Sequence, residues 1–305
     1  MPRKRKSTAD AVDDPEPKRR VTRSSTAQEL GESKPKTPVH KASKPPKASL
    51  PKAKKAKAKG SSPKEEDEVP NGPTTITISH NSVKNPISCH QYTSEAKNEQ
   101  DAPTLIFTHG AGGTLSAPAV VNFCTGYSKG APILAFQGSM NLKARAKAFH
   151  ACISHHEINN SNAKSLVLGG RSMGARAAVI AASEHLASSS ASTAEMKLVL
   201  VSYPLKGPKD DIRDQILLDL PSAVHVLFVI GDRDTMCPLD LLEETRKKMA
   251  AKSSLVIVKG ADHGMHVKGR DREKALGEES GIKAFDWVSG KLKDEVIRLG
   301  EELDE

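Results

Sequence analysis

The stretch that decides the fold is Lys164-Ser165-Leu166-Val167-Leu168-Gly169-Gly170-Arg171-Ser172-Met173-Gly174-Ala175-Arg176, which continues as a run of small residues to Ala182. The apolar run predicts a buried strand, and the segment after Met173 predicts a helix. Between them, Gly170, Ser172 and Gly174 have the spacing of a nucleophile elbow, a tight turn that projects a serine hydroxyl beyond the edge of a sheet. Glycine is needed on both sides because a side chain there would collide with the neighbouring strand and helix.

A second glycine-rich loop, His109-Gly110-Ala111-Gly112-Gly113, follows the apolar run of residues 104–108. Gly110 and Gly112 let the backbone turn sharply, so the N–H of Ala111 can join that of Met173 in an oxyanion hole. The alternative is a phosphate-binding loop, but neither G-K-[ST] nor G-x-G-x-x-G is present. We expect His109 to brace this loop rather than to act as a base.

An acid and a histidine follow in the chain order Ser, Asp, His that an elbow of this kind requires. Asp234 closes the sequence Gly231-Asp232-Arg233-Asp234 after the apolar run of residues 224–230, so it lies at a strand end where it can orient a histidine. Asp232 is the alternative acid, although we expect it to brace the loop. His263, after the run of residues 254–258, is the predicted general base for Ser172. His266 is the alternative base. Either histidine could also be an ordinary polar residue at the surface with no catalytic role.

Strands and helices alternate along the rest of the chain. The β-branched residues 74–79 predict an edge strand with a hairpin partner within residues 81–91. Further strands are expected at residues 104–108, 132–136, 164–168, 196–202, 224–230 and 254–258, and helices at residues 117–128, 142–157 and 282–299, with others after the elbow and up to residue 250. This order predicts an α/β protein with a mostly parallel central sheet and helices on both faces. The connection of residues 203–223 is too short for a large lid.

The first 70 residues differ in composition from the rest. They contain 19 Lys and Arg against 10 Asp and Glu, which accounts for the whole net charge of +9, and 10 of the 19 prolines but none of the aromatic residues. Such a segment cannot bury enough apolar surface to offset its ordering entropy. We therefore expect a disordered basic tail over residues 1–72 and a folded domain over residues 73–305, beginning near Thr74.

Two basic clusters in the tail have the layout of a two-part nuclear localisation signal. They consist of Arg3, Lys4, Arg5, Lys6, Lys18, Arg19 and Arg20. A solvated basic run is the alternative. The Lys/Ala/Pro-rich residues 51–60 resemble linker-histone tails, which predicts weak, salt-sensitive contact with nucleic acid or chromatin without base recognition.

Neither a metal nor an organic cofactor is implied by the residue patterns. His150, His155 and His156 lack the H-E-x-x-H spacing, which favours solvated or helix-end histidines. The four cysteines form no C-x-x-C pair, so we expect free thiols in a reducing compartment. We recognise neither a secretory leader nor a membrane span, and expect a soluble protein without membrane contact.

Three segments carry a resemblance to known proteins. Residues 169–178, Ser202-Tyr203-Pro204-Leu205 and Gly231-Asp232-Arg233-Asp234 resemble the dienelactone-hydrolase-like branch of the α/β hydrolases. More narrowly, they resemble the intracellular family that includes testis-expressed protein thirty and the third subunit of the non-specific lethal histone acetyltransferase complex. The resemblance spans residues 74–295. It implies an α/β-hydrolase fold with Ser172, Asp234 and His263 as the catalytic triad.

Two functional hypotheses are consistent with these patterns. In the first, the protein is a nuclear serine hydrolase acting on a small ester, thioester or related acyl compound, with Ser172 as nucleophile. In the second, the hydrolase fold is a non-catalytic platform in a nuclear protein complex, and the basic tail tethers it to chromatin. The complete triad favours the first hypothesis, whereas the tail and the narrower resemblance favour the second.

Overall fold

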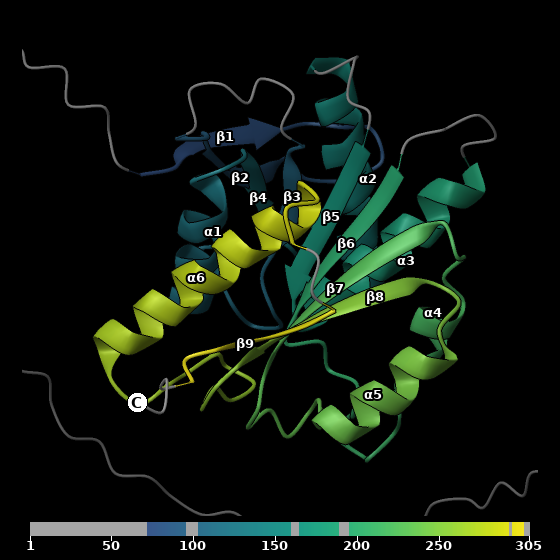
Figure 1. Ribbon diagram of the computed structural model, residues 1–305. Coiled ribbons are helices and arrows are strands. Elements are labelled where there is room, and N and C mark those ends of the chain that lie inside the picture. The colour runs from purple at the N-terminus through teal and green to yellow at the C-terminus, as the bar shows by residue number, and fades with distance from the viewer. Residues whose placement is uncertain (1–71, 96–102, 160–164, 189–194, 293–294, 302–305) are drawn as a thin grey trace, which may run out of the picture. The chain divides into compact units, whose positions relative to one another are not determined.

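One twisted sheet organises the folded part of the chain (Figure 1). The computed structural model describes residues 72–95, 103–159, 165–188, 195–292 and 295–301. The predictions for the tail, including its nuclear localisation signal, lie outside these residues. The first strand begins at Thr74, the position predicted for the start of the folded domain.

Within the described ranges the sheet has nine strands in the order β1-β2-β4-β3-β5-β6-β7-β8-β9. Their bounds, in the same order, are Thr74–Ile78, Ile87–Tyr92, Ile133–Phe136, Leu105–Thr108, Ser165–Arg171, Glu195–Val201, Val224–Gly231, Lys252–Val258 and Val296–Leu299. The β1–β2 hairpin is antiparallel and β2 pairs antiparallel with β4, while the other pairs are parallel. The predicted edge strand, its hairpin partner and the mostly parallel sheet are all confirmed.

Both faces of the central strands are buried, which explains the continuous apolar runs in the sequence. Along β7, Val226, Phe228 and Ile230 contribute to one hydrophobic cluster. Leu227 and Val229 contribute to another on the opposite face. Successive strand residues point to opposite faces, so a strand covered on both sides must be apolar at every position.

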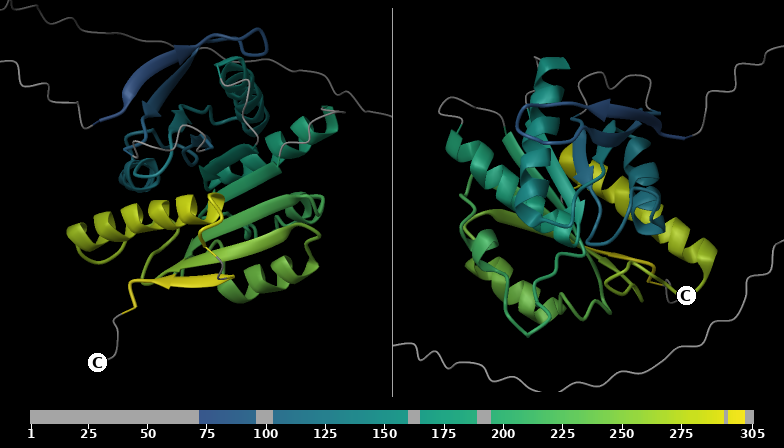
Figure 2. Two further views of the ribbon diagram at one scale, coloured as in Figure 1. Left: turned by 45° about the horizontal axis from the view of Figure 1, so that its top comes forward. Right: turned by 180° about the vertical axis from the view of Figure 1, so that it is seen from behind.

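Of the helices in the described parts of the chain, two cover one face of the sheet and four cover the other (Figures 1 and 2). The first pair packs together and consists of α1, Pro118–Ser128, and α6, Arg270–Val288. The second group is α2, Leu142–Asn159; α3, Met173–Ser188; the short α4, Gln215–Leu218; and α5, Leu239–Lys248. This arrangement is the α/β-hydrolase fold. Of the helices in the described ranges, none is long and apolar enough to cross a membrane.

The C-terminal region differs from the prediction of one helix over residues 282–299. Helix α6 instead begins at Arg270 and ends at Val288, and Val296–Leu299 forms β9, parallel to β8. The helix ends because Gly290, just beyond it, has a positive φ of 73°, a conformation typical of helix C-termini. The β-branched pair Val296 and Ile297 then pairs with β8, a long-range contact that local periodicity does not report.

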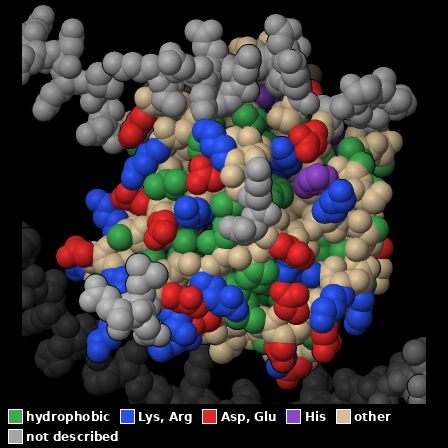
Figure 3. Space-filling view, in the orientation of Figure 1, with side chains coloured by type: hydrophobic (Ala, Val, Ile, Leu, Met, Phe, Trp, Pro, Cys, Tyr) green, Lys and Arg blue, Asp and Glu red, His purple; other side chains and the backbone are tan. Residues whose placement is uncertain are grey.

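Charges of both signs are intermixed on the face of the domain drawn in Figure 3. Residues 71–305 contain 27 basic and 27 acidic side chains, so the folded part of the chain contributes nothing to the net charge. The basic excess therefore distinguishes the tail from the domain.

Candidate active site

The three predicted triad residues and His109 lie in the segments that follow β3, β5, β7 and β8. These four strands run parallel, so their carboxyl ends meet at one edge of the sheet. His109 follows β3, Ser172 follows β5, Asp234 follows β7 and His263 follows β8.

The turn at Ser172 is tight and strained. Ser172 has a φ of 53°, in the left-handed region that residues with a Cβ rarely occupy. Its N–H donates to the carbonyl of Val201 at 2.9 Å, which fastens the turn to β6. A Cβ on Gly170 would lie 2.4 Å from the backbone of Gly174, and one on Gly174 would lie 2.6 Å from the carbonyl oxygens of Thr108 and His109. The close packing predicted at both glycines is therefore present.

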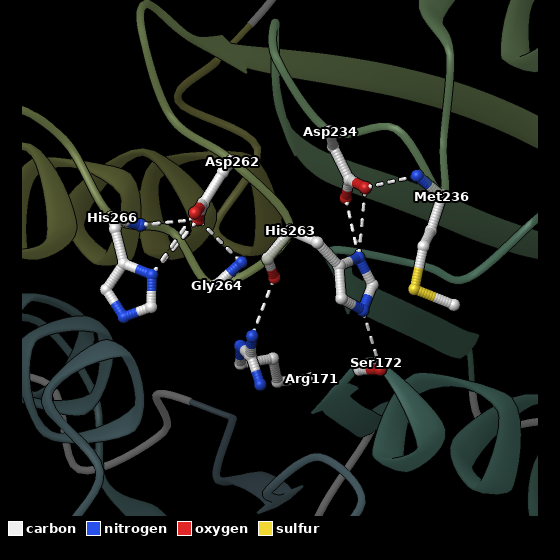
Figure 4. Close-up of polar contacts among 8 residues, drawn as sticks. All are labelled: Arg171, Ser172, Asp234, Met236, Asp262, His263, Gly264 and His266. Atoms are coloured by element: carbon white, nitrogen blue, oxygen red, sulfur yellow. Dashed lines mark hydrogen bonds and ion pairs between the residues drawn. The ribbon is translucent and has the colours of Figure 1, made fainter.

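Ser172, His263 and Asp234 form a continuous chain of contacts (Figure 4). The Ser172 Oγ lies 2.9 Å from His263 Nε2, and His263 Nδ1 lies 2.9 and 3.0 Å from the two oxygens of Asp234. The Asp234 side chain is fully buried, whereas that of His263 is 22% exposed. The N–H of Met236 donates to Asp234 at 2.8 Å and fixes the carboxylate. A serine, a general base and an orienting acid in this geometry can carry out nucleophilic acyl transfer.

The alternative acid and base have other contacts. The Asp232 carboxylate accepts from the N–H of Gly260 at 2.6 Å and lies 3.5 Å from Lys259 Nζ. The His266 ring is exposed and contacts Asp262 rather than Ser172 (Figure 4). Asp262 also accepts from the N–H of Gly264, so the Asp262–His266 pair closes the loop that carries His263.

The glycine-rich loop after β3 lies next to the serine. A Cβ on Gly110 would be 3.4 Å from the Ser172 Cβ. The N–H of Gly112 is used, because it donates to the Met140 sulfur at 2.8 Å. Met173 is the first residue of α3, where backbone N–H groups have no partner within the helix. In the described part of the chain no hydrogen bond uses the N–H of Ala111 or of Met173, so both can donate to a ligand.

His109 is buried, and its ring contacts both the glycine-rich loop and the loop after β4. Its Nε2 accepts from the N–H of Gly138 at 3.0 Å, so the ring proton is on Nδ1, which donates to the carbonyl of Gly110 at 2.7 Å. The Gln137 side chain contacts the same Nε2 at 2.7 Å. Burial, reinforced by the nearby Arg145 charge, holds the pKa of His109 below its ordinary value. A neutral ring in contact with two loops is suited to support rather than to proton transfer.

Sequence reasoning missed a role for Arg171, which directly precedes the serine. Its Nη2 donates to the carbonyl of His263 at 2.6 Å, and a Cβ on Gly110 would lie 2.8 Å from its Nη1. The guanidinium therefore lies between the glycine-rich loop and the histidine loop. Burial lowers the pKa of Arg171, and the nearby carboxylates of Asp234 and Asp262 oppose this. Its position beside Ser172 in the motif was the signal that could have identified it.

The three clustered histidines of α2 make separate contacts. His150 pairs with Glu184 at 2.8 Å, and His155 contacts Asn159. Burial lowers the pKa of His156, which lies on the core side of the helix. Within the described ranges, no three metal-ligating side chains are grouped closely enough to hold an ion. The four cysteines are free and buried.

Comparisons with known proteins agree with the fold. The family model described as "Alpha/beta hydrolase domain" matches residues 101–280, more than half of the chain. An α/β serine hydrolase homologue from Coxiella burnetii is 17% identical, with a TM-score of 0.53, over 72% of this chain and 97% of that one. A serine hydrolase without a lid from Xanthomonas campestris is 17% identical, with a TM-score of 0.52, over 71% and 96%.

A third similar structure is the dienelactone hydrolase from Anabaena variabilis. It is 14% identical, with a TM-score of 0.54, over 73% of this chain and 100% of that one. At these identities the likeness establishes the fold. The sheet, the serine turn and the family match together define the class as the α/β hydrolases. The chain belongs to the α/β hydrolase domain family.

Proposed function

We propose that this protein is a serine hydrolase that cleaves small carboxylic esters or thioesters. The observation that carries the proposal is the contact of Ser172 Oγ with His263 Nε2 at 2.9 Å, with Asp234 on the other ring nitrogen. The strained turn supports the proposal, as do the N–H groups of Ala111 and Met173, which make no hydrogen bond within the described residues. The esterases among structures of this fold, including Est1E from Butyrivibrio proteoclasticus, are consistent with this class of reaction.

In the proposed reaction, Ser172 Oγ attacks the acyl carbon while its proton passes to His263 Nε2. The carbonyl oxygen becomes an oxyanion held by the N–H groups of Ala111 and Met173. As the tetrahedral intermediate collapses, His263 returns the proton to the departing alkoxide or thiolate. Water then attacks the acyl-enzyme by the same route and frees the acid. Asp234 keeps the imidazole oriented and stabilises its charged form.

The test is covalent labelling of the folded, full-length protein with a fluorophosphonate probe, compared between wild type and Ser172→Ala. We expect the wild type to label at one site and the variant to remain unlabelled with an unchanged melting temperature. Turnover of p-nitrophenyl acetate and of short thioesters would then define the acyl group. A folded wild-type protein that neither labels nor turns over these compounds would contradict the proposal.

We also propose that residues 1–72 direct the protein to the nucleus and hold it near nucleic acid. The support is the charge distribution, because the whole net charge of +9 lies in the first 70 residues. The narrower family resemblance favours a role beside chromatin, in which the domain serves as an interaction platform. Deleting residues 1–64 should abolish nuclear accumulation and low-salt DNA binding while leaving fluorophosphonate labelling intact. Equal DNA binding by both proteins at low salt would exclude the nucleic-acid role.

A further inference from the structure

Arg145 is a buried cation on the first turns of α2, and it is fully inaccessible to solvent. Its nitrogens donate to backbone carbonyls, and within the described ranges it has no ion pair with a carboxylate. Nε and Nη2 donate to Ser139 O at 2.9 and 2.7 Å, and Nη2 also donates to Gly138 O at 3.2 Å. Nη1 donates to His109 O and, at 3.4 Å, to Gly110 O. Burial lowers the pKa of Arg145 to about 10, so the group stays charged at neutral pH.

These contacts connect two loops at the carboxyl edge of the sheet. Residues 109 and 110 belong to the glycine-rich loop after β3, and residues 138 and 139 belong to the loop after β4. Burying a charge carries a large desolvation cost, which oriented carbonyl dipoles offset here. The side chain therefore favours one arrangement of these carbonyls, in which they converge on the guanidinium.

The orientation of the Gly110 carbonyl determines where the next N–H points. The carbonyl oxygen accepts from His109 Nδ1 at 2.7 Å, from Arg145 Nη1 at 3.4 Å and from Gly113 N at 3.4 Å. In a trans peptide the C=O and the following N–H point in opposite directions. The N–H of the Gly110–Ala111 peptide consequently points away from Arg145 and His109, on the side of the loop that those two residues do not occupy.

We propose that Arg145, acting with His109, is a positioning residue for catalysis: it fixes the Gly110–Ala111 peptide so that the Ala111 N–H faces the oxyanion formed at Ser172. This inference rests on the proposed hydrolase function. Donation to the carbonyl also polarises the peptide unit, which strengthens its N–H as a donor. Arg145 touches neither substrate nor Ser172, and it acts through one peptide plane.

The experiment compares Arg145→Ala with Arg246→Ala in the full-length protein. Arg246 is the control because its side chain is also buried, at 4% exposure, and also donates to a backbone carbonyl, that of Ser253, but from α5 and with ion pairs to Glu243 and Glu295. The measurements are the second-order rate of fluorophosphonate labelling, its pH dependence and the melting temperature. Added guanidinium at millimolar concentration tests whether the missing cation can be restored in the Arg145→Ala cavity.

We expect Arg145→Ala to label about 100-fold more slowly than wild type, since a misplaced oxyanion donor costs about that factor. The pH dependence should be unchanged because His263 and Asp234 keep their contacts. Guanidinium should restore part of the rate to Arg145→Ala and none to wild type. Arg246→Ala should lose comparable thermal stability yet label at close to the wild-type rate.

Three results would overturn the inference: wild-type labelling by folded Arg145→Ala, equal loss of labelling in Arg246→Ala, or a slowed Arg145→Ala that guanidinium does not rescue. If Arg145→Ala does not fold, His109→Gln replaces it. Glutamine can accept from the Gly138 N–H but cannot make the Nδ1–H donation to Gly110, so labelling should again slow, and an unchanged rate would overturn the inference. A folded wild type that never labels contradicts the proposed function itself, which is a separate outcome.

Discussion

Two serines in this protein have similar positive φ angles but opposite surroundings. Ser172 follows β5 with a φ of 53°, and Ser202 follows β6 with a φ of 47°. Each donates its N–H at 2.9 Å to a carbonyl of the next strand, Val201 or Val229. Ser172 is partly exposed and contacts His263, whereas Ser202 is fully buried and its Oγ has no hydrogen-bond partner among the residues that the structure describes.

The difference arises from the segment on the C-terminal side of each turn. After Ser172 the chain enters helix α3 directly, with Gly174 allowing close approach to β3. After Ser202 it continues through buried Tyr203, whose hydroxyl donates to the carbonyl of Arg213 at 2.8 Å. A strained turn at the carboxyl edge is therefore insufficient for a nucleophile. Access and a positioned base distinguish the two sites.

The largest effect is expected when the base is removed, because Ser172 then lacks a positioned histidine, as Ser202 does. His263→Ala should slow fluorophosphonate labelling by at least about 10⁴-fold, because loss of the general base leaves an unactivated hydroxyl. His266→Ala is the control, since its exposed ring contacts Asp262 and not Ser172, and it should label within about twofold of wild type. Comparable losses in both variants would mean that the wrong histidine has been assigned.

The second prediction measures access to the two turns directly. In Ser172→Cys and Ser202→Cys, native-state alkylation by iodoacetamide should differ by at least about 100-fold, since the buried thiol reacts only after local opening. The four natural cysteines are buried and provide a low background. Rapid alkylation of folded Ser202→Cys would show that the second turn also reaches solvent, and would remove the contrast.

The third prediction concerns the residue two positions after each serine. Gly174→Ala should lower the melting temperature by roughly 5–10 °C, because the added methyl would lie 2.6 Å from two backbone oxygens and overpacking costs about 2–3 kcal/mol. Pro204→Ala removes two buried methylenes without a clash and should cost about 1.6 kcal/mol, at about 0.8 kcal/mol each. Thermal unfolding checks both. A Gly174→Ala variant as stable as wild type would show that the elbow is loosely packed.

The smallest expected effect is the loss of stability at acid pH that arises from His109 in the glycine-rich loop. His109 has a lowered pKa in the folded state, so the unfolded chain binds the extra proton first. The free energy of unfolding should be greatest above pH about 6.5 and fall as the pH drops below it, by at most about 1.4 kcal/mol per pH unit for one histidine.

Urea denaturation between pH 7 and pH 5 measures this slope. His109→Gln should flatten it and also slow labelling. His156→Gln should flatten it too, because burial lowers the pKa of His156, but without an effect on labelling. A slope unchanged in His109→Gln would mean that this histidine is not the acid-sensitive group of the loop.

The elbow and its strand were predictable from sequence because they depend on local chemistry. A continuous apolar run indicates a strand covered on both faces, and glycines two residues before and after a serine are required by contacts within one strand–turn–helix unit. The acid and the base could be placed because parallel strands bring their carboxyl ends to one edge. The choices between Asp234 and Asp232, and between His263 and His266, required side-chain geometry that sequence does not provide.

The roles that sequence reasoning missed depend on distant contacts. Arg145 lies in the sequence Leu142-Lys143-Ala144-Arg145-Ala146-Lys147, which is typical of a solvent-exposed helix. Its burial depends on carbonyl groups from two other loops, and the sequence does not show that these surround it. Helix α6 is rich in charged residues with weak apolar periodicity, and β9 exists through pairing with β8. Local pattern cannot report a partner that lies about 40 residues away in sequence.

The short strand β9 has a practical consequence for anyone shortening or fusing this protein. It pairs with residues Leu255 to Val258 of β8, and Leu299 O also accepts from Lys259 N at 2.9 Å. A chain cut before Val296 would leave the backbone N–H and C=O groups along this edge of β8 exposed and unpaired. A second copy could then add a strand there, so self-association rather than unfolding is the expected failure of such a truncation.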